Sequence, residues 1–96
     1  MLINDFYING RRKRRGKIDI IANILLIAQD SSKKTQIMYD ANLSFQQLKN
    51  YLKNLTESGL LVEKKDGNSR IYKTTEKGKE FLKYYINIRK ILSPKD

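Results

Sequence analysis

The segment between Ser44 and Gly59 carries a complete set of signals for one helix, and it constrains the fold more than any other part of the chain. Ser44 followed by Gln47 matches a capping box, in which two side chains satisfy free amide groups at a helix start. Apolar residues then recur at i, i+3, i+7 and i+10, namely Phe45, Leu48, Leu52 and Leu55. Gly59 suits the left-handed residue just past a helix, and Leu60 suits the apolar contact of a Schellman ending. We predict a helix over residues 44–58 whose apolar stripe is buried.

Two strand-like segments follow this helix directly. Residues 61–65 and 70–74 are short, and Asp66-Gly67-Asn68-Ser69 between them is a strong hairpin-turn signal. The sequence therefore predicts a β-hairpin immediately after the best-marked helix.

A last helix is predicted over residues 76–92. Thr75 is a suitable N-cap, and Ser93-Pro94 ends the pattern. Gly78 is unusual in the first turns of a helix, where it costs roughly 1 kcal/mol relative to Ala. We expect another part of the chain to pack closely against Gly78.

The part of the chain before Ser44 predicts two further helices. Residues 17–29 have a wide apolar face at helical spacing, and residues 33–40 read as a short helix after the break Asp30-Ser31-Ser32. Ala41-Asn42-Leu43 reads as a tight turn. A short helix, a tight turn and a capped helix make a helix-turn-helix, and a hairpin directly after them makes a winged helix.

The predicted fold is therefore mainly α with a small β-hairpin, a winged helix-turn-helix domain over residues 17–92 that ends in a long helix. A chain of 96 residues suffices for one such domain. Residues 1–16 read as a basic tail, because Asn9-Gly10 and Gly16 break regular structure around a run of like charges. The apolar residues at the start of the tail could form a short strand or dock on the domain.

The charge balance indicates a polyanion as partner. Twenty Lys and Arg residues face ten Asp and Glu residues, a formal net charge of +10. Without residues 1–17 the chain keeps 14 basic and nine acidic residues, so the rest of the chain still carries +5. Such a surface attracts nucleic acid through the release of bound counterions, whatever the base sequence.

The outward face of the helix predicted over residues 44–58 is suited to the major groove. Gln and Asn can pair with the N6 and N7 edge of adenine, and Lys can reach guanine or phosphate. No acidic residue interrupts this face before Glu57, whereas an ordinary solvated face usually mixes both charges. The candidate DNA-binding residues of this helix are Ser44, Gln46, Gln47, Lys49, Asn50 and Lys53.

Two further basic segments are candidate DNA contacts. The hairpin, over residues 64–73, would act as a wing on the phosphate backbone or in the minor groove, although a charged edge strand also deters aggregation. The tail resembles an arm that follows phosphates or the minor groove, although such runs also occur as plain solvated charge. The candidate residues are Lys64, Lys65, Arg70 and Lys73 in the hairpin and Arg11, Arg12, Lys13, Arg14 and Arg15 in the tail.

The last helix carries more apolar surface than one domain of this size can cover. A stripe at i, i+4, i+7 and i+11 is formed by Phe81, Tyr85, Ile88 and Leu92, and further apolar residues lie off it. A helix that is apolar on several sides is buried on several sides, so one side closes the core and another pairs with a second copy. We predict a homodimer with the candidate contacts Tyr84, Ile88, Ile91 and Leu92.

The composition argues against catalysis, metal binding and a membrane span. The chain has no Cys and no His, which removes disulfides, Cys/His zinc sites and every catalytic triad that uses imidazole. Its carboxylates are scattered, and no Gly-rich phosphate loop is evident. The apolar run over residues 24–28 is too short to span a bilayer. We expect a non-enzymatic protein without cofactor, metal or small-molecule ligand, located in the cytoplasm on the nucleoid.

A pattern that covers about residues 17–92 is shared with a known family. Its parts are residues 34–48, Tyr51-Leu52, Ser58-Gly59-Leu60-Leu61, Tyr72 and residues 74–82. They resemble archaeal winged-helix proteins of the 10a chromatin type and related archaeal transcription regulators. The resemblance implies an archaeal source, DNA binding and dimers through an antiparallel coiled coil of the last helices. The chain departs from the family in its unusually basic tail and in a last helix that is short for a long coiled coil.

Three functions fit these observations. The chain is a DNA-binding transcriptional regulator, an architectural chromatin protein with low sequence specificity, or a winged-helix module that binds protein or RNA. The amides on the outward face favour the regulator, since phosphate contacts alone would need only Lys and Arg.

Overall fold

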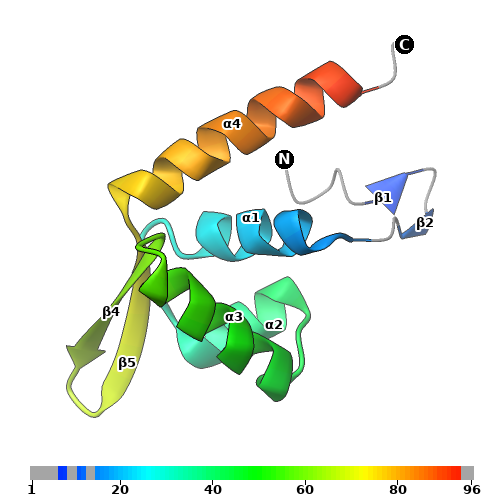
Figure 1. Cartoon of the computed structure of the whole chain (residues 1–96). Coiled ribbons are helices and arrows are strands. Elements are labelled where there is room, and N and C mark those ends of the chain that lie inside the picture. Colours follow the sequence, from blue (N-terminus) through cyan, green and yellow to red (C-terminus); the bar gives the residue numbers. More distant parts are fainter. Residues whose placement is uncertain (1–6, 9–10, 13–14, 94–96) are drawn as a thin grey trace.

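Four helices and a three-stranded antiparallel sheet make up most of the described part of the chain in this computed structural model, which describes residues 7–8, 11–12 and 15–93 (Figure 1). The helices are α1 (Lys17–Ile27), α2 (Lys34–Ala41), α3 (Phe45–Glu57) and α4 (Glu76–Leu92). The strands of the sheet are β3 (Ser32–Lys33), β4 (Leu61–Asp66) and β5 (Ser69–Thr74), and a separate pair is formed by β1 (Tyr7–Ile8) and β2 (Arg11–Arg12). The predicted order of helices and hairpin and the mainly α fold class are confirmed.

Both ends of α3 form as the sequence predicts. Oγ of Ser44 accepts a hydrogen bond from the Gln47 amide at 3.1 Å, and Oε1 of Gln47 accepts one from the Ser44 amide at 3.0 Å. At the other end Gly59 has a φ of +80°. The Leu60 amide then donates to the Leu55 carbonyl at 2.9 Å, which is the long bond of a Schellman ending. These bonds satisfy main-chain groups that a helix leaves open, so residues near the ends determine the bounds of α3.

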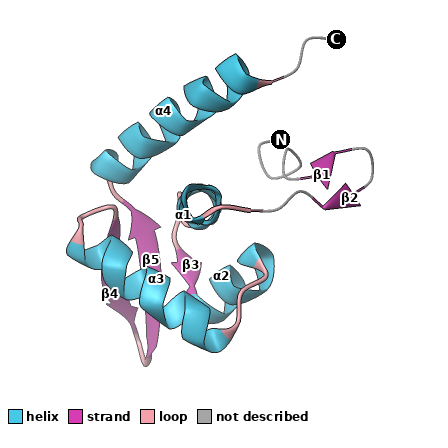
Figure 2. Cartoon of the chain, turned by 45° about the vertical axis from the view of Figure 1, so that its right-hand side comes forward, coloured by secondary structure: helices cyan, strands magenta, loops and turns pink. Residues whose placement is uncertain are grey.

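Helix α1 lies at the centre of the domain, with α4 on one side and α2 and α3 on the other (Figure 1 and Figure 2). Its residues Ile24 and Leu25 are fully buried, as are Ile37 of α2 and Leu48 of α3. Burying an apolar side chain of this size contributes about 1.5–3 kcal/mol, so packing around α1 holds the helices together. The hydroxyl of Thr74, at the end of β5, donates to the Leu25 carbonyl at 2.6 Å and joins the sheet to α1.

Phe45 is not part of the core, which corrects the buried stripe predicted for α3. Its side chain is 59% exposed, whereas the three leucines of that stripe are buried. Leu43, just before the helix, belongs to the same buried cluster as Leu48, an arrangement typical of a hydrophobic staple. Leu43 therefore closes the core at the start of α3. Phe45 stays outside, where Nζ of Lys34 lies 4.6 Å from the centre of its ring.

The hairpin is confirmed, and a third strand joins it that the sequence does not signal. Leu61 pairs with Thr74 at the base and Asp66 with Ser69 at the tip, and Gly67 in the turn has a φ of +66°. The short strand β3 comprises the last residue of the predicted break and Lys33, the first residue of the helix predicted over 33–40, so α2 begins one residue later than predicted. It pairs with β5. Two residues are too few for an alternating apolar pattern, so only the pairing with β5 reveals this strand.

Helix α4 packs on α1 with its first half and extends away from α2, α3 and the sheet with its second half (Figure 1). Oγ1 of Thr75 accepts a hydrogen bond from the amide three residues on at 3.1 Å, which confirms the predicted N-cap. Leu82 and Tyr85 are buried, and the Tyr85 hydroxyl donates to Oδ1 of Asp19 in α1 at 2.5 Å. The buried side of α4 therefore runs through Leu82 and Tyr85.

The second half of α4 leaves apolar side chains exposed. Of the stripe predicted along this helix, Tyr85 is buried and Phe81 is partly buried, but Ile88 and Leu92 are exposed. The stripe thus leaves the body of the domain where α4 passes the start of α1. Among the described residues, neither α4 nor any other helix is long and apolar enough to cross a membrane.

Candidate nucleic-acid interface

The outward face of α3 presents amide and lysine side chains to solvent. The exposed residues of this face include Gln46, Lys49, Asn50, Lys53 and Asn54. Nε2 of Gln46 lies 3.5 Å from Oδ1 of Asn50, one helical turn further along. Residues at this spacing are neighbours on a helix surface, so the two amides form one polar edge. Amide side chains are among those that can pair with base edges in the major groove.

Ser44 and Gln47 have a structural role beside their predicted contact with DNA. Both side chains form the capping box of α3, which occupies Oε1 of Gln47. The amino group of Gln47 is the part of that amide available to an outside acceptor. Gln46 and Asn50 are the predicted base-contacting amides that take no part in the cap.

The four predicted cations of the hairpin divide between its two faces. Residues opposite each other in an antiparallel pair share a face, and neighbours along a strand alternate. Arg70 pairs with Lys65 and lines a cleft against α3, so both lie on the face turned toward that helix. Lys64 and Lys73 alternate with them and lie on the other face. The structure therefore brings two of the four cations to the side of α3.

A cleft of about 310 Å³ lies between α3 and the hairpin. It is lined by Lys49, Leu52, Lys53 and Thr56 from α3, by Glu63, Arg70 and Tyr72 from the hairpin, and by Lys34 from the start of α2. Four of these side chains are cations and one is a carboxylate. A cleft lined mainly by one sign of charge focuses the potential that attracts a polyanion. We refer to it as the wing cleft.

Lys34, Glu63 and Tyr72 line the wing cleft, although the sequence patterns do not mark them as contacts. Oε2 of Glu63 accepts hydrogen bonds from Nη1 of Arg70 at 2.9 Å and from the Tyr72 hydroxyl at 3.3 Å. Burial, together with the charge of Glu63, raises the pKa of Tyr72 above its ordinary value, so this hydroxyl keeps its proton and remains a donor. The hairpin register pairs Glu63 with Tyr72, so a register predicted from the turn could have placed the Glu63 carboxylate beside the Tyr72 hydroxyl.

A second cleft flanks α3 on the side of α1. Its volume is about 480 Å³, and it is lined by Lys17 of α1 and by Gln47, Asn50, Tyr51, Lys53 and Asn54 of α3. Lys53 borders both clefts. The exposed face of α3 is therefore a ridge between two clefts, each of which contains lysine.

Part of the predicted basic tail lies within the described residues. Arg11 and Arg12 form β2, whereas Lys13 and Arg14 lie outside the described residues. Nη2 of Arg15 donates to the carbonyl of Ala41 at 2.9 Å. Ala41 is the last residue of α2, where the carbonyls lack helical partners and the helix dipole is negative. Arg15 therefore caps α2 and joins the end of the tail to the domain.

Residues 14–93 match a family model described as a winged helix-turn-helix. The chain belongs to the winged helix-turn-helix family. Its helix-turn-helix consists of α2, the turn and α3, and the hairpin of β4 and β5 is its wing. An uncharacterised protein of Methanocaldococcus jannaschii is 29% identical over 87 residues, which cover 90% of this chain and 86% of that protein.

Two solved structures of DNA-binding proteins are similar to this chain. Sso10a-2, a DNA-binding protein from Sulfolobus solfataricus, matches with a TM-score of 0.73 and 31% identity, over 81% of this chain and 85% of that one. F93 from STIV, a winged-helix DNA-binding protein, matches with a TM-score of 0.67 and 22% identity, over 86% of this chain and 100% of that one. The first match confirms the predicted resemblance to proteins of the 10a type, and the second shows the fold alone.

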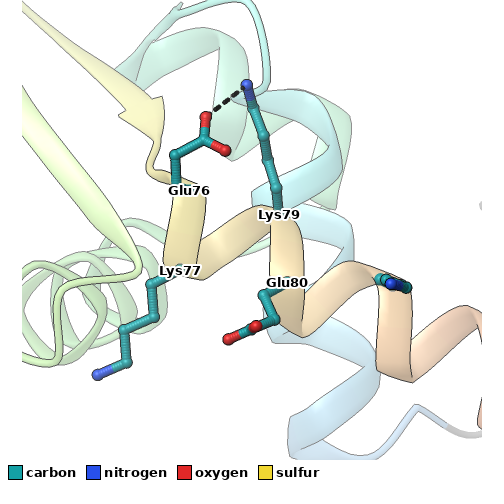
Figure 3. Close-up of a pocket in the computed structure, with 5 residues that line it drawn as sticks. Glu76, Lys77, Lys79 and Glu80 are labelled. Atoms are coloured by element: carbon teal, nitrogen blue, oxygen red, sulfur yellow. Dashed lines mark hydrogen bonds and ion pairs between the residues drawn. The ribbon is translucent and has the colours of Figure 1, made fainter.

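The winged helix has a further hollow at the start of α4 (Figure 3). Its volume is about 430 Å³, and it is lined by Glu76, Lys77, Lys79, Glu80 and Lys83. Nζ of Lys79 lies 3.2 Å from Oε2 of Glu76. Lys77 points away from this pair, and its Nζ donates to the Ser58 carbonyl at the end of α3 at 2.8 Å. Acidic and basic groups mix here, so this hollow lacks the predominantly positive charge of the wing cleft.

The four predicted dimer contacts are exposed on the second half of α4. The exposed fractions are 58% for Tyr84, 54% for Ile88, 79% for Ile91 and 73% for Leu92. Residues at i, i+4 and i+7 share one side of a helix, so Tyr84, Ile88 and Ile91 form a continuous apolar strip. A contiguous apolar patch on a small domain typically marks an interaction surface.

Proposed function

We propose that this winged-helix protein binds duplex DNA and regulates transcription, with α3 in the major groove and the wing against the phosphate backbone. The observation that carries the proposal is the ridge of α3, which presents amides and lysines and has no carboxylate before Glu57. An α-helix fits the width of the major groove, and the lysines beside the ridge can reach the flanking phosphates. Sso10a-2 is itself a DNA-binding protein, which supports the same class of partner for this chain.

Anisotropy of a fluorescently labelled duplex tests DNA binding directly. Affinity should fall at least about tenfold between roughly 50 and 200 mM salt if several phosphates are contacted. Unlabelled single-stranded DNA and double-stranded RNA serve as competitors and should displace the duplex less well than duplex DNA does. Absence of binding at low salt, or an affinity that does not change with salt, contradicts the proposal.

An architectural chromatin protein is the second candidate function. The net charge of +10 and the four cations of the wing cleft favour binding that depends on phosphates alone. The outward amides of α3 favour a regulator, because base edges carry the sequence information. Mapping of bound DNA across the genome separates the two, since a regulator yields sharp peaks and an architectural protein yields broad coverage.

A homodimer through the second half of α4 is part of the proposal. The exposed strip of Tyr84, Ile88 and Ile91 supplies an apolar surface for a second copy. A twofold pair would suit duplex DNA, because two α3 helices could then enter successive major grooves about 34 Å apart. This pairing would also bury the part of α4 that extends beyond the body of the domain.

A further inference from the structure

The wing cleft contains one carboxylate among its cations. Of the described residues that line it, Glu63 is acidic, whereas Lys34, Lys49, Lys53 and Arg70 are basic. A carboxylate in such a position opposes the binding of a second anion, because like charges repel at close range. Glu63 therefore needs a physical role in a surface that is otherwise suited to phosphate.

Glu63 holds the cation that the wing would present to DNA. Its Oε2 accepts from Nη1 of Arg70 at 2.9 Å, and the side chains of Arg70 and Glu63 are 64% and 36% exposed. Exposed ion pairs of this kind are weak, so another anion can replace the carboxylate. The Tyr72 hydroxyl donates to the same oxygen at 3.3 Å, which adds a second donor for an incoming anion.

A phosphate group can take the place of the carboxylate on Arg70. It offers the arginine two oxygens for parallel hydrogen bonds, whereas Glu63 contacts Arg70 through Oε2 at 2.9 Å, and nearby lysines attract it as point charges. Lys49 and Lys53 come from the ridge of α3, and Arg70 comes from the wing. A phosphate in the wing cleft would therefore contact both elements that are proposed to hold the duplex.

We propose that a backbone phosphate of bound DNA enters the wing cleft and replaces the Glu63 carboxylate on Arg70. This inference rests on the proposed function, and it makes Glu63 a competitor of DNA phosphate for Arg70. Each binding event must break the pair of Glu63 and Arg70, whatever the base sequence. The pair thus weakens phosphate contacts on all DNA by about the same amount.

A double-mutant cycle tests whether Glu63 competes with DNA for Arg70. Wild type, Arg70→Ala, Glu63→Gln and the double variant are titrated with one random-sequence duplex at fixed salt. Without the Glu63 carboxylate, Arg70 can bind phosphate without first breaking an ion pair. Arg70→Ala should therefore weaken binding about two- to fivefold more in the Glu63→Gln background than in wild type, the range expected for an exposed ion pair. An equal or smaller loss in that background overturns the inference, and a smaller one would mean that Glu63 positions Arg70 for DNA.

Glu57→Gln is the matched control for net charge. Glu57 lies at the end of α3, is exposed and does not line the wing cleft. Its removal should raise affinity through the general field, but the loss caused by Arg70→Ala should be the same with and without it. Circular dichroism should show that every variant is folded, because both paired side chains are partly exposed. A wild type that binds no duplex overturns the proposed function, whereas binding without the expected coupling overturns this inference alone.

Discussion

Gly78, in the first turn of α4, lies directly against the main-chain carbonyl group of Leu60. A β-carbon at residue 78 would lie 2.6 Å from Cγ2 of Thr74 and closer still to the Leu60 oxygen. That oxygen also accepts the Thr75 amide at 3.1 Å, so it cannot move aside without loss of a hydrogen bond. The close contact predicted from the position of Gly78 is confirmed.

Gly78→Ala should lower the free energy of unfolding by about 1–2 kcal/mol. Ala is the better helix former by about 1 kcal/mol, but the overlap with main chain that cannot move outweighs that gain. Urea unfolding of the variant beside wild type measures the difference. Lys79→Ala, an exposed change in the same turn, should have little effect. A Gly78→Ala protein as stable as wild type would refute the contact.

Leu48 and Phe45 should differ in their contribution to stability, although both belong to the apolar pattern of α3. Leu48 is fully buried, so Leu48→Ala should cost about 2–5 kcal/mol. Phe45 is exposed and contacts Lys34, so Phe45→Ala should cost less than about 1 kcal/mol. Thermal unfolding of the two variants compares them, and a Phe45→Ala protein as damaged as Leu48→Ala would place Phe45 in the core after all.

Asn50 and Lys65 should separate base contacts from phosphate contacts, because Lys65 lies on the face of the wing turned toward α3. Asn50→Ala should reduce the preference for the cognate site by about 1–3 kcal/mol if its contact is bidentate, whereas Lys65→Ala should weaken binding to all DNA about equally. The cognate site comes from selection out of random duplexes, and binding is compared with a scrambled duplex. Gln47 is the poorer test residue, because its change to Ala also removes half of the capping box. If Asn50→Ala and Lys65→Ala behave alike on both duplexes, the assignment of roles is wrong.

Deletion of the tail should reduce affinity for DNA of every sequence and flatten its salt dependence. Removal of residues 1–14 takes away four cations ahead of Arg15 and keeps the bond from Arg15 to Ala41. Removal of residues 1–15 also takes that bond away. It should lower the free energy of unfolding by about a further 0.3–1 kcal/mol, the usual effect of a cation at a helix C-terminus. Anisotropy and thermal unfolding of the two deletions measure both effects. An unchanged salt slope would exclude the tail from the interface.

Ile91→Lys should convert a homodimer into a folded monomer that binds DNA more weakly. Ile91 is 79% exposed in the single chain, so the change should not disturb the core. Burying Ile88 and Ile91 against a second copy should stabilise the pair by about 1.5–3 kcal/mol per side chain. Light scattering at micromolar concentration gives the mass, and circular dichroism reports folding. Lys90→Ala on the neighbouring position should leave the mass unchanged, and a monomeric wild type would refute the dimer.

Local signals in the sequence account for α3 and the hairpin. The capping box links Ser44 with Gln47, and the Schellman ending links Leu55 with Leu60, so each signal involves groups a few residues apart. The turn at Gly67 likewise depends on its own backbone conformation. Such interactions form wherever their residues occur in order, and a pattern can therefore predict them.

Contacts between distant segments were decided only by the tertiary structure. The sequence placed Phe45 in a stripe at helical spacing, but Leu43 closes the core there and leaves the ring outside. Strand β3 exists because β5 lies beside it, and no property of two residues alone indicates a strand.

The proposed DNA surface shows the same division. The amides and lysines of α3 could be predicted from sequence alone, because polar residues at helical spacing face away from a buried stripe. The four cations of the wing were also predicted, but their division between the two faces of the hairpin appears only in the structure. The sequence could not show that Glu63 forms an ion pair with Arg70, or that Arg15 caps α2 at Ala41 across 26 positions of the chain. Those contacts depend on how α2, α3 and the wing pack around α1, and this packing follows from the burial of the whole core and not from any one segment.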